Sequence, residues 1–246
     1  MPDLVLPAIL LTFLLAGLVK GVIGLGLPTI AVGLLSLAMT PAEAAAILIV
    51  PSTVTNIWQL VAGPSLAALI RRFWPMMLGI CLGTWAGSGL LTGAGTAMAS
   101  TALGIALIVY AILGLVTPRF SVPAGSQPWL GPIVGAATGL VTAATGVFVV
   151  PAVPYLQALG LEKDDLVQAL GLSFTVSTFA LAASLAHEGA FQGSDAMLSL
   201  AALVPALGGM CAGQWLRGRI SAALFRRCFF LGLLGLGLHL ALRHAL

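Results

Sequence analysis

The chain has 246 residues, of which 60% are hydrophobic and only 7% are charged, and its formal net charge is +3. Soluble domains carry about 25% charged residues, so this composition, with a mean hydropathy of +1.12, excludes a soluble globular protein. In hydrocarbon every backbone polar group has to pair within the structure, so the expected fold is an all-α membrane protein, a helical bundle.

The first apolar segment, residues 4–39, is too long for one crossing helix, which needs about 20 apolar residues. Its middle, GLVKGVIGLGLPTI, carries Lys20, Gly24, Gly26 and Pro28. Because irregular backbone at membrane depth has to be buried or line a cavity, we expect a broken or V-shaped helical hairpin. Its second arm would begin at Pro28 with free N–H groups that favour an anion. Lys20 would pair with that anion, or else reach from a helix end to the membrane surface.

The next crossing helix, residues 44–62, carries a polar stripe. Ser52, Thr55, Asn56 and Gln59 are spaced i, i+3, i+4 and i+7, which places them on one helical face. Their side chains can donate hydrogen bonds to the oxygens of an anion. The alternative is that they hold neighbouring helices together, as polar residues do in membrane bundles.

Two further crossing helices, residues 74–92 and 100–117, complete the first half of the chain. The segment 117–128, TPRFSVPAGSQP, then has the proline, glycine and serine content of a linker.

A second interrupted segment, residues 130–158, opens the second half. It is too long for one crossing and too short for two at 1.5 Å per residue, and TAATG at 142–146 breaks it. We expect a second hairpin here, in which Thr142, Thr145 and Gly146 lie at the start of a new half-helix.

Three crossing helices follow, residues 166–186, 197–216 and 229–245. The first carries Ser173 and Ser177, which share a helical face because they are four residues apart. These hydroxyls are the expected counterpart of the polar stripe in the first half.

The chain repeats itself. The pattern P-x3-G-x-C-x-G-x-W at 75–85 recurs 130 positions later at 205–215, and Gly17 and Gly21 match Gly135 and Gly139. We expect two copies of one unit, residues 1–120 and 128–246, and packing roles for the cysteine and tryptophan of each copy. No Cys-x-x-Cys or Cys/His cluster is present, so we expect no metal, cofactor or disulfide.

Loop charges indicate that the two copies are inverted. Arginines gather at 71–72 and at 217–227, whereas the equivalent loops at 187–195 and 93–99 carry no Lys or Arg. Because basic loops stay in the cytoplasm, equivalent loops face opposite sides of the membrane. Inverted repeats with interrupted helices are typical of secondary transporters.

Several of these stretches resemble the TauE/SafE family of sulfite and organosulfonate exporters. They are KGVIGLGLPTIAVGLL and PSTVTN in the first half, and TGLVTAATGVFVVPAVPYLQALGL and LSFTVSTF in the second. The first hairpin departs from the family's common G-x-G-G-G, since it reads Gly24-Leu25-Gly26. The second hairpin has Ala143 and Ala144.

The resemblance implies a multi-pass transporter of the bacterial inner (plasma) membrane that exports sulfite or an organosulfonate such as sulfoacetate. Alternating access between the two inverted halves is the expected mechanism. The alternatives are an anion channel and a transporter of another small organic anion. The expected substrate-binding residues are Lys20, Gly24, Gly26, Ser52, Thr55, Asn56, Gln59, Thr142, Thr145, Gly146, Ser173 and Ser177.

An enzyme is not expected, because the sequence contains no H-E-x-x-H or G-x-S-x-G motif and no pair of carboxylates in mid-membrane. The expected partners are the small anion and the lipid bilayer, without nucleic acid. A homodimer is a possible assembly for so small a transporter.

Overall fold

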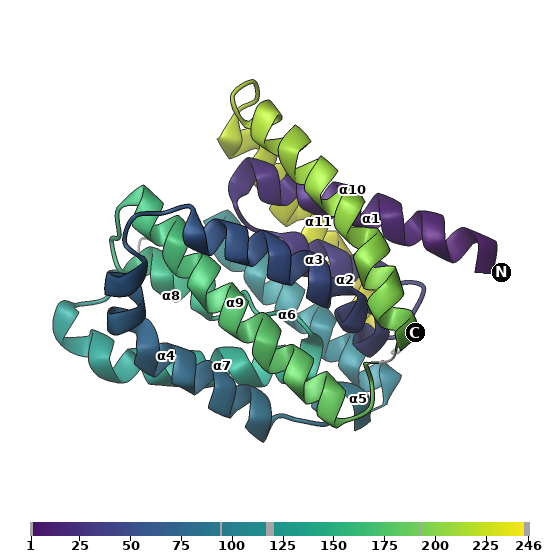
Figure 1. Ribbon diagram of the computed structural model, residues 1–246, viewed down its shortest axis with the longest axis horizontal. Helices are drawn as coiled ribbons and strands as arrows, with labels where there is room; N and C mark the ends of the chain where they lie inside the picture. The colour runs from purple at the N-terminus through teal and green to yellow at the C-terminus, as the bar shows by residue number, and fades with distance from the viewer. Residues whose placement is uncertain (1, 94, 117–120, 192, 244–246) are drawn as a thin grey trace.

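The computed structural model describes residues 2–93, 95–116, 121–191 and 193–243 (Figure 1). Across these residues the chain forms helices and no strand. Seven of the helices are long and apolar enough to cross a membrane, which confirms an all-α, multi-pass membrane protein. Residues 117–120 of the expected linker and the last three residues of the chain lie outside the described part.

The first interrupted segment consists of α1 (Pro2–Ile23) and α2 (Leu27–Leu35). Gly24 and Gly26 between them have φ values of 77° and 105°, a conformation that glycine adopts without strain. The break is therefore present, but the two arms are unequal. Residues Val5–Ile23 of α1 are long and apolar enough to cross the membrane by themselves, although they include Lys20.

The second interrupted segment consists of α7 (Gln127–Thr145) and α8 (Ala152–Ala158). The expectation that Thr142 and Thr145 begin a new half-helix is wrong. Both lie in the last turns of α7, where their hydroxyls donate to Thr138 O and Val141 O at 2.7 Å. The helix ends at Gly146, which has a φ of 73° and donates its N–H to Thr142 O, as helix C-termini commonly do.

The remaining helices agree in order with the expected crossings. They are α3 (Pro41–Val61), α4 (Leu66–Ala86), α6 (Thr96–Val116), α9 (Lys163–His187), α10 (Gly193–Arg217) and α11 (Ala222–Leu242). The short α5 (Leu90–Gly93) and the 3₁₀ turn η1 (Ala124–Ser126) were not expected and lie in the connections on either side of α6.

Helices α1 and α10 pack against each other, as do α4 and α7, with their backbones in contact at glycines. A Cβ atom on Gly17 of α1 would lie 2.1 Å from Ala206 O of α10. A Cβ on Gly135 of α7 would lie 2.2 Å from Met76 O of α4. Such close approach is the usual role of small residues between membrane helices. It leaves no room for any side chain at these positions.

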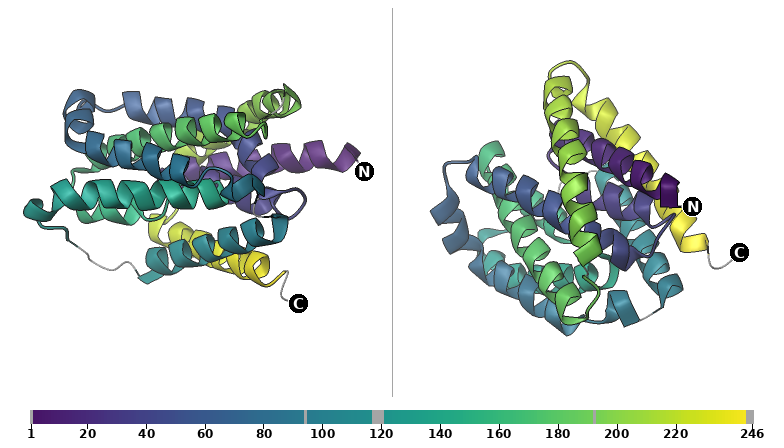
Figure 2. Two further views of the ribbon diagram at one scale, coloured as in Figure 1. Left: turned by 90° about the horizontal axis from the view of Figure 1, so that it is seen from below. Right: turned by 45° about the vertical axis from the view of Figure 1, so that its right-hand side comes forward.

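Helices α3 and α9 lie side by side in the middle of the molecule, and α6 and α11 form a further pair (Figures 1 and 2). The α3–α9 pair is antiparallel, since Ser52 contacts Thr178 at one level and Gln59 contacts Val167 at another. This central pair lies next to α1, whose last turn carries Lys20.

The expected packing role of the repeated cysteines and tryptophans is wrong. Trp85 and Trp215 have 80% and 62% of their surface exposed, and Cys81 and Cys211 are exposed too. The glycines of the motif are the members that make close backbone contact with a partner helix. The sequence misleads here because the outer surface of a membrane protein is as apolar as its core.

Candidate functional site

Lys20 is the centre of the candidate site. Only 5% of its surface is exposed, and its Nζ donates to Thr55 Oγ1 at 2.9 Å and to Asn56 Oδ1. Both acceptors are uncharged, and the carbonyl end of α1 adds only a partial negative charge. A buried charge is costly unless it is paired. Among the described residues, the charged form of Lys20 therefore has only neutral hydrogen-bond partners, and an incoming anion would supply the counter-ion.

A continuous hydrogen-bond network connects Lys20 to α9. The Asn56 Nδ2 donates to Ser52 Oγ at 3.0 Å and to Thr178 Oγ1 at 3.2 Å. Thr178 donates its own proton to Phe174 O at 2.7 Å, so it accepts from Asn56 and, across 3.2 Å, from Ser52. Side chains of α1, α3 and α9 thus meet at one point. Three of these side chains, Ser52, Thr55 and Asn56, share one face of α3 because of their i, i+3, i+4 spacing.

Ser173 and Ser177 of α9 are fully buried. Among the described residues neither hydroxyl has a hydrogen-bond partner. Leaving such a group unpaired costs about 1–3 kcal/mol. Ser173 and Ser177 are four residues apart and so share one face of α9, and neither hydroxyl is used within the described part of the chain.

Gln59 does not join this cluster. Its Nε2 donates to Val167 O at 3.0 Å, which fastens α3 to the start of α9. The neighbouring Gln168, fully buried, donates in return to Leu60 O at 2.7 Å and to Gly63 O at 2.8 Å. The two glutamines hold α3 and α9 together. For Gln59 the structure therefore supports the alternative interpretation, in which a polar residue of the stripe links neighbouring helices.

Sequence reasoning missed Gln168 and Ser199. Ser199 of α10 donates to Ile47 O at 2.7 Å and accepts from Val50 N at 3.0 Å. Ile47 O is the acceptor that Pro51, which has no N–H, leaves free. Pro51 inside α3 indicates that a carbonyl one turn earlier needs a hydrogen-bond donor from elsewhere. The sequence does not say which helix provides that donor.

The two backbone breaks differ in their surroundings. A Cβ on Gly24 would meet nothing within 4 Å, whereas one on Gly146 would lie 2.9 Å from the Cβ of Ala45 in α3. Gly26 caps α2, and its carbonyl accepts from Thr29 Oγ1 at 2.9 Å. The first break therefore has open space beside Gly24, whereas a Cβ on Gly26 would lie 2.9 Å from Val19 Cγ1. The second break is packed against the core at Gly146.

The structure thus brings four of the expected residues into direct contact: Lys20, Ser52, Thr55 and Asn56, with Thr178 as a fifth member. We call these five residues the Lys20 cluster. Thr142 and Thr145 instead bond to carbonyls of their own helix.

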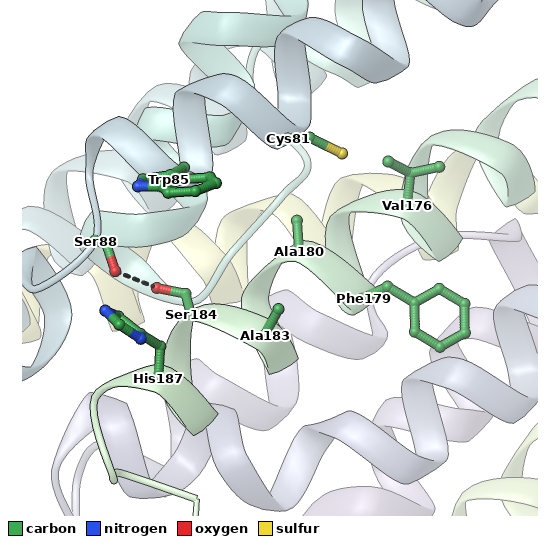
Figure 3. Close-up of a pocket in the computed structure, with 9 residues that line it drawn as sticks. All are labelled: Cys81, Trp85, Ser88, Val176, Phe179, Ala180, Ala183, Ser184 and His187. Carbon is green, nitrogen blue, oxygen red and sulfur yellow. Dashed lines mark hydrogen bonds between the residues drawn. The ribbon is translucent and has the colours of Figure 1, made fainter.

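A cavity of about 570 Å³ lies elsewhere, between α4 and α9 (Figure 3). Its lining is almost entirely apolar and includes none of the residues expected to bind the substrate. An anion gains nothing from such a lining, so this cavity is not the site of the charge chemistry.

Comparison with known proteins identifies one family. The family model described as "Sulfite exporter TauE/SafE" matches residues 9–240, nearly the whole chain. The chain therefore belongs to the TauE/SafE family of membrane transporters, as the sequence motifs indicate. No curated protein and no solved structure matches it.

Proposed function

We propose that this member of the TauE/SafE family exports a small sulfur-containing oxyanion, sulfite or an organosulfonate such as sulfoacetate, and binds it at the Lys20 cluster. The observation that carries the proposal is a buried lysine whose protein partners, Thr55 and Asn56, are both neutral. An anion beside Nζ supplies a counter-ion, and the hydroxyls of Ser173 and Ser177, which have no hydrogen-bond partner among the described residues, supply hydrogen bonds to it.

The two halves, residues 1–120 and 128–246, form inverted repeats in this proposal. Gly17 contacts Ala206, and its counterpart Gly135 contacts Met76, which is 130 positions before Ala206. Equivalent helices that touch run in opposite directions, as α3 and α9 do. A two-fold axis that relates antiparallel spanning helices lies in the membrane plane, which is the arrangement found in many secondary transporters.

Transport proceeds by rocking of one half against the other. The Lys20 cluster spans the boundary, because Lys20, Ser52 and Asn56 come from the first half and Thr178 from the second. Its hydrogen bonds across the boundary join neutral groups, and each contributes only about 1 kcal/mol. These hydrogen bonds alone therefore do not lock the two halves together at the cluster. The closely packed pairs α1–α10 and α4–α7 also join the halves. Gly24, which has open space beside it, provides the hinge.

Export needs no second ion in this scheme. A negative-inside potential drives anions out of the cell with about 2.3 kcal/mol per charge per 100 mV. A plasma membrane of a bacterium supplies that potential, and a homodimer is compatible with the exposed apolar faces of the outer helices.

The alternatives are an anion channel and a transporter of another small organic anion. A channel passes ions without a full conformational cycle. Its flux would therefore not saturate as a carrier's does, and anion on the opposite side of the membrane would not accelerate it. A different organic anion would change the selectivity of binding and leave the role of Lys20 unchanged.

Binding to the purified protein tests the proposal. Thermal stabilisation would be recorded with sulfite, sulfate, sulfoacetate, taurine, acetate and chloride, because a ligand that binds only the folded state raises stability by mass action. The variant is Lys20→Met, and the control is Lys163→Met, which alters the exposed lysine at the start of α9. A shift with sulfite or a sulfonate in the wild type and Lys163→Met, lost in Lys20→Met, is expected. An equal shift in all three proteins would contradict the assignment.

A further inference from the structure

The cavity between α4 and α9 is an open groove on the outer surface of the bundle (Figure 3). Trp85 of α4 lines one wall and is 80% exposed, and Phe179 of α9 lines the other and is 53% exposed. Val176 and Ala183 of α9 extend the apolar lining along the same wall as Phe179. Both α4 and α9 are helices that can cross the membrane, so the groove opens sideways toward lipid.

The length of the groove matches one leaflet of a bilayer. Its α9 wall extends from Val176 to His187, a rise of 11 residue steps or about 16 Å at 1.5 Å per residue. Half of a hydrocarbon core of about 30 Å is about 15 Å. The groove therefore extends from the membrane surface, where α9 ends, to about the middle of the membrane.

Polar groups gather at one end of the groove only. Ser88 and Ser184 face each other there at 3.1 Å (Figure 3). Ser88 also donates to the carboxylate of Glu188 at 2.5 Å, and Thr92 donates to its other oxygen. Hydrogen bonds from Ser88 and Thr92 hold the pKa of Glu188 below its usual value. An ionised carboxylate thus lies next to this end of the groove, bonded to Ser88, and His187 lines the same end.

We propose that this groove binds one membrane phospholipid, with an acyl chain along Val176 and Phe179 and an ammonium head group beside Glu188. The apolar lining and the leaflet-length wall fit the chain, and the carboxylate fits a cationic group and repels an anionic one. The ring of Trp85 lies near the same end, at the level where tryptophans are enriched in membrane proteins. Phosphatidylethanolamine has the required chemistry, and phosphatidylglycerol does not.

Lipid retention on the delipidated protein tests this. Phosphatidylethanolamine and phosphatidylglycerol with identical acyl chains would be added in detergent, and retained molecules counted by native mass spectrometry. Because an exposed charge pair contributes little, we expect a preference of about two- to fivefold for the ethanolamine lipid. Glu188→Gln should abolish the preference, and Ala183→Trp, which fills the groove, should lower retention of both lipids.

The matched control is Ala212→Trp, which places the same ring on the exposed face of α10 and should leave retention unchanged. Equal retention of the two lipids by the wild type would overturn the proposal, as would wild-type retention in Ala183→Trp. Conversion of a dimer to a monomer by Ala183→Trp, with retention unchanged, would overturn it in favour of a second copy of the chain on this face. None of these outcomes depends on the transported anion.

Discussion

Two neighbouring glycines of α10 give a sharp prediction about helix packing. A Cβ on Gly209 would lie 2.1 Å from Leu14 O of α1, whereas a Cβ on Gly208 would meet nothing within 4 Å. Ordinary contact begins at about 3.4 Å, so Gly209→Ala requires α1 and α10 to move apart by about 1.3 Å, the difference between 3.4 and 2.1 Å. Overpacking of this kind costs about 1–3 kcal/mol.

Gly208→Ala removes the same backbone freedom from the same helix without the clash. Alanine is favoured over glycine in a helix interior by about 1 kcal/mol, so Gly208→Ala should leave the melting temperature unchanged or raise it slightly. Gly209→Ala should lower the melting temperature of the detergent-solubilised protein by several degrees. Equal melting temperatures for the two variants would refute the close contact of α1 with α10. They would also remove one of the helix contacts from which we infer that the two halves are inverted repeats.

Three further outcomes are expected from hydrogen bonding. Ser199→Ala leaves Ile47 O without the partner that replaces the missing N–H of Pro51, and should lower the free energy of unfolding by about 1–3 kcal/mol in denaturant titrations. Ser177→Ala removes a buried hydroxyl that has no partner among the described residues, so it should leave the melting temperature unchanged or raise it while weakening sulfite binding; a loss of stability with intact binding would contradict its role. The lowered pKa of Glu188 means that its contribution to stability is present above about pH 4.5 and is lost as the pH falls through the lowered pKa. Melting curves of wild type and Glu188→Gln should therefore differ at neutral pH and converge in acid, and a gap that widens in acid would contradict this.

The crossing helices were predictable because length and hydropathy determine them in a membrane. The stripe of Ser52, Thr55 and Asn56 was predictable too, since helical spacing fixes which side chains share a face. The sequence also contained the contact glycines, such as Gly17 and Gly135, as a repeat. These features depend on local periodicity, which a single sequence displays directly.

Other features depend on which helices become neighbours, and the sequence alone does not say. Thr142 and Thr145 looked like residues of a helix start, but their hydroxyls bond to the preceding turn and the helix continues to Gly146. Gln59 has the spacing of the stripe, yet the carbonyl of Val167 on another helix takes its amide. Thr178 entered the Lys20 cluster because α9 packs against α3. The sequence placed it near Ser173 and Ser177 but did not say which helix it would face.

Sulfite transport by the reconstituted protein is the measurement that tests the role of the Lys20 cluster most directly. Proteoliposomes loaded with sulfite would be assayed for saturable efflux and for acceleration by sulfite on the other side, with wild type, Lys20→Met and Lys163→Met at equal reconstitution. Saturable, accelerated efflux by the wild type and Lys163→Met, abolished in Lys20→Met, is the predicted result. Undiminished efflux through well-folded Lys20→Met would contradict it.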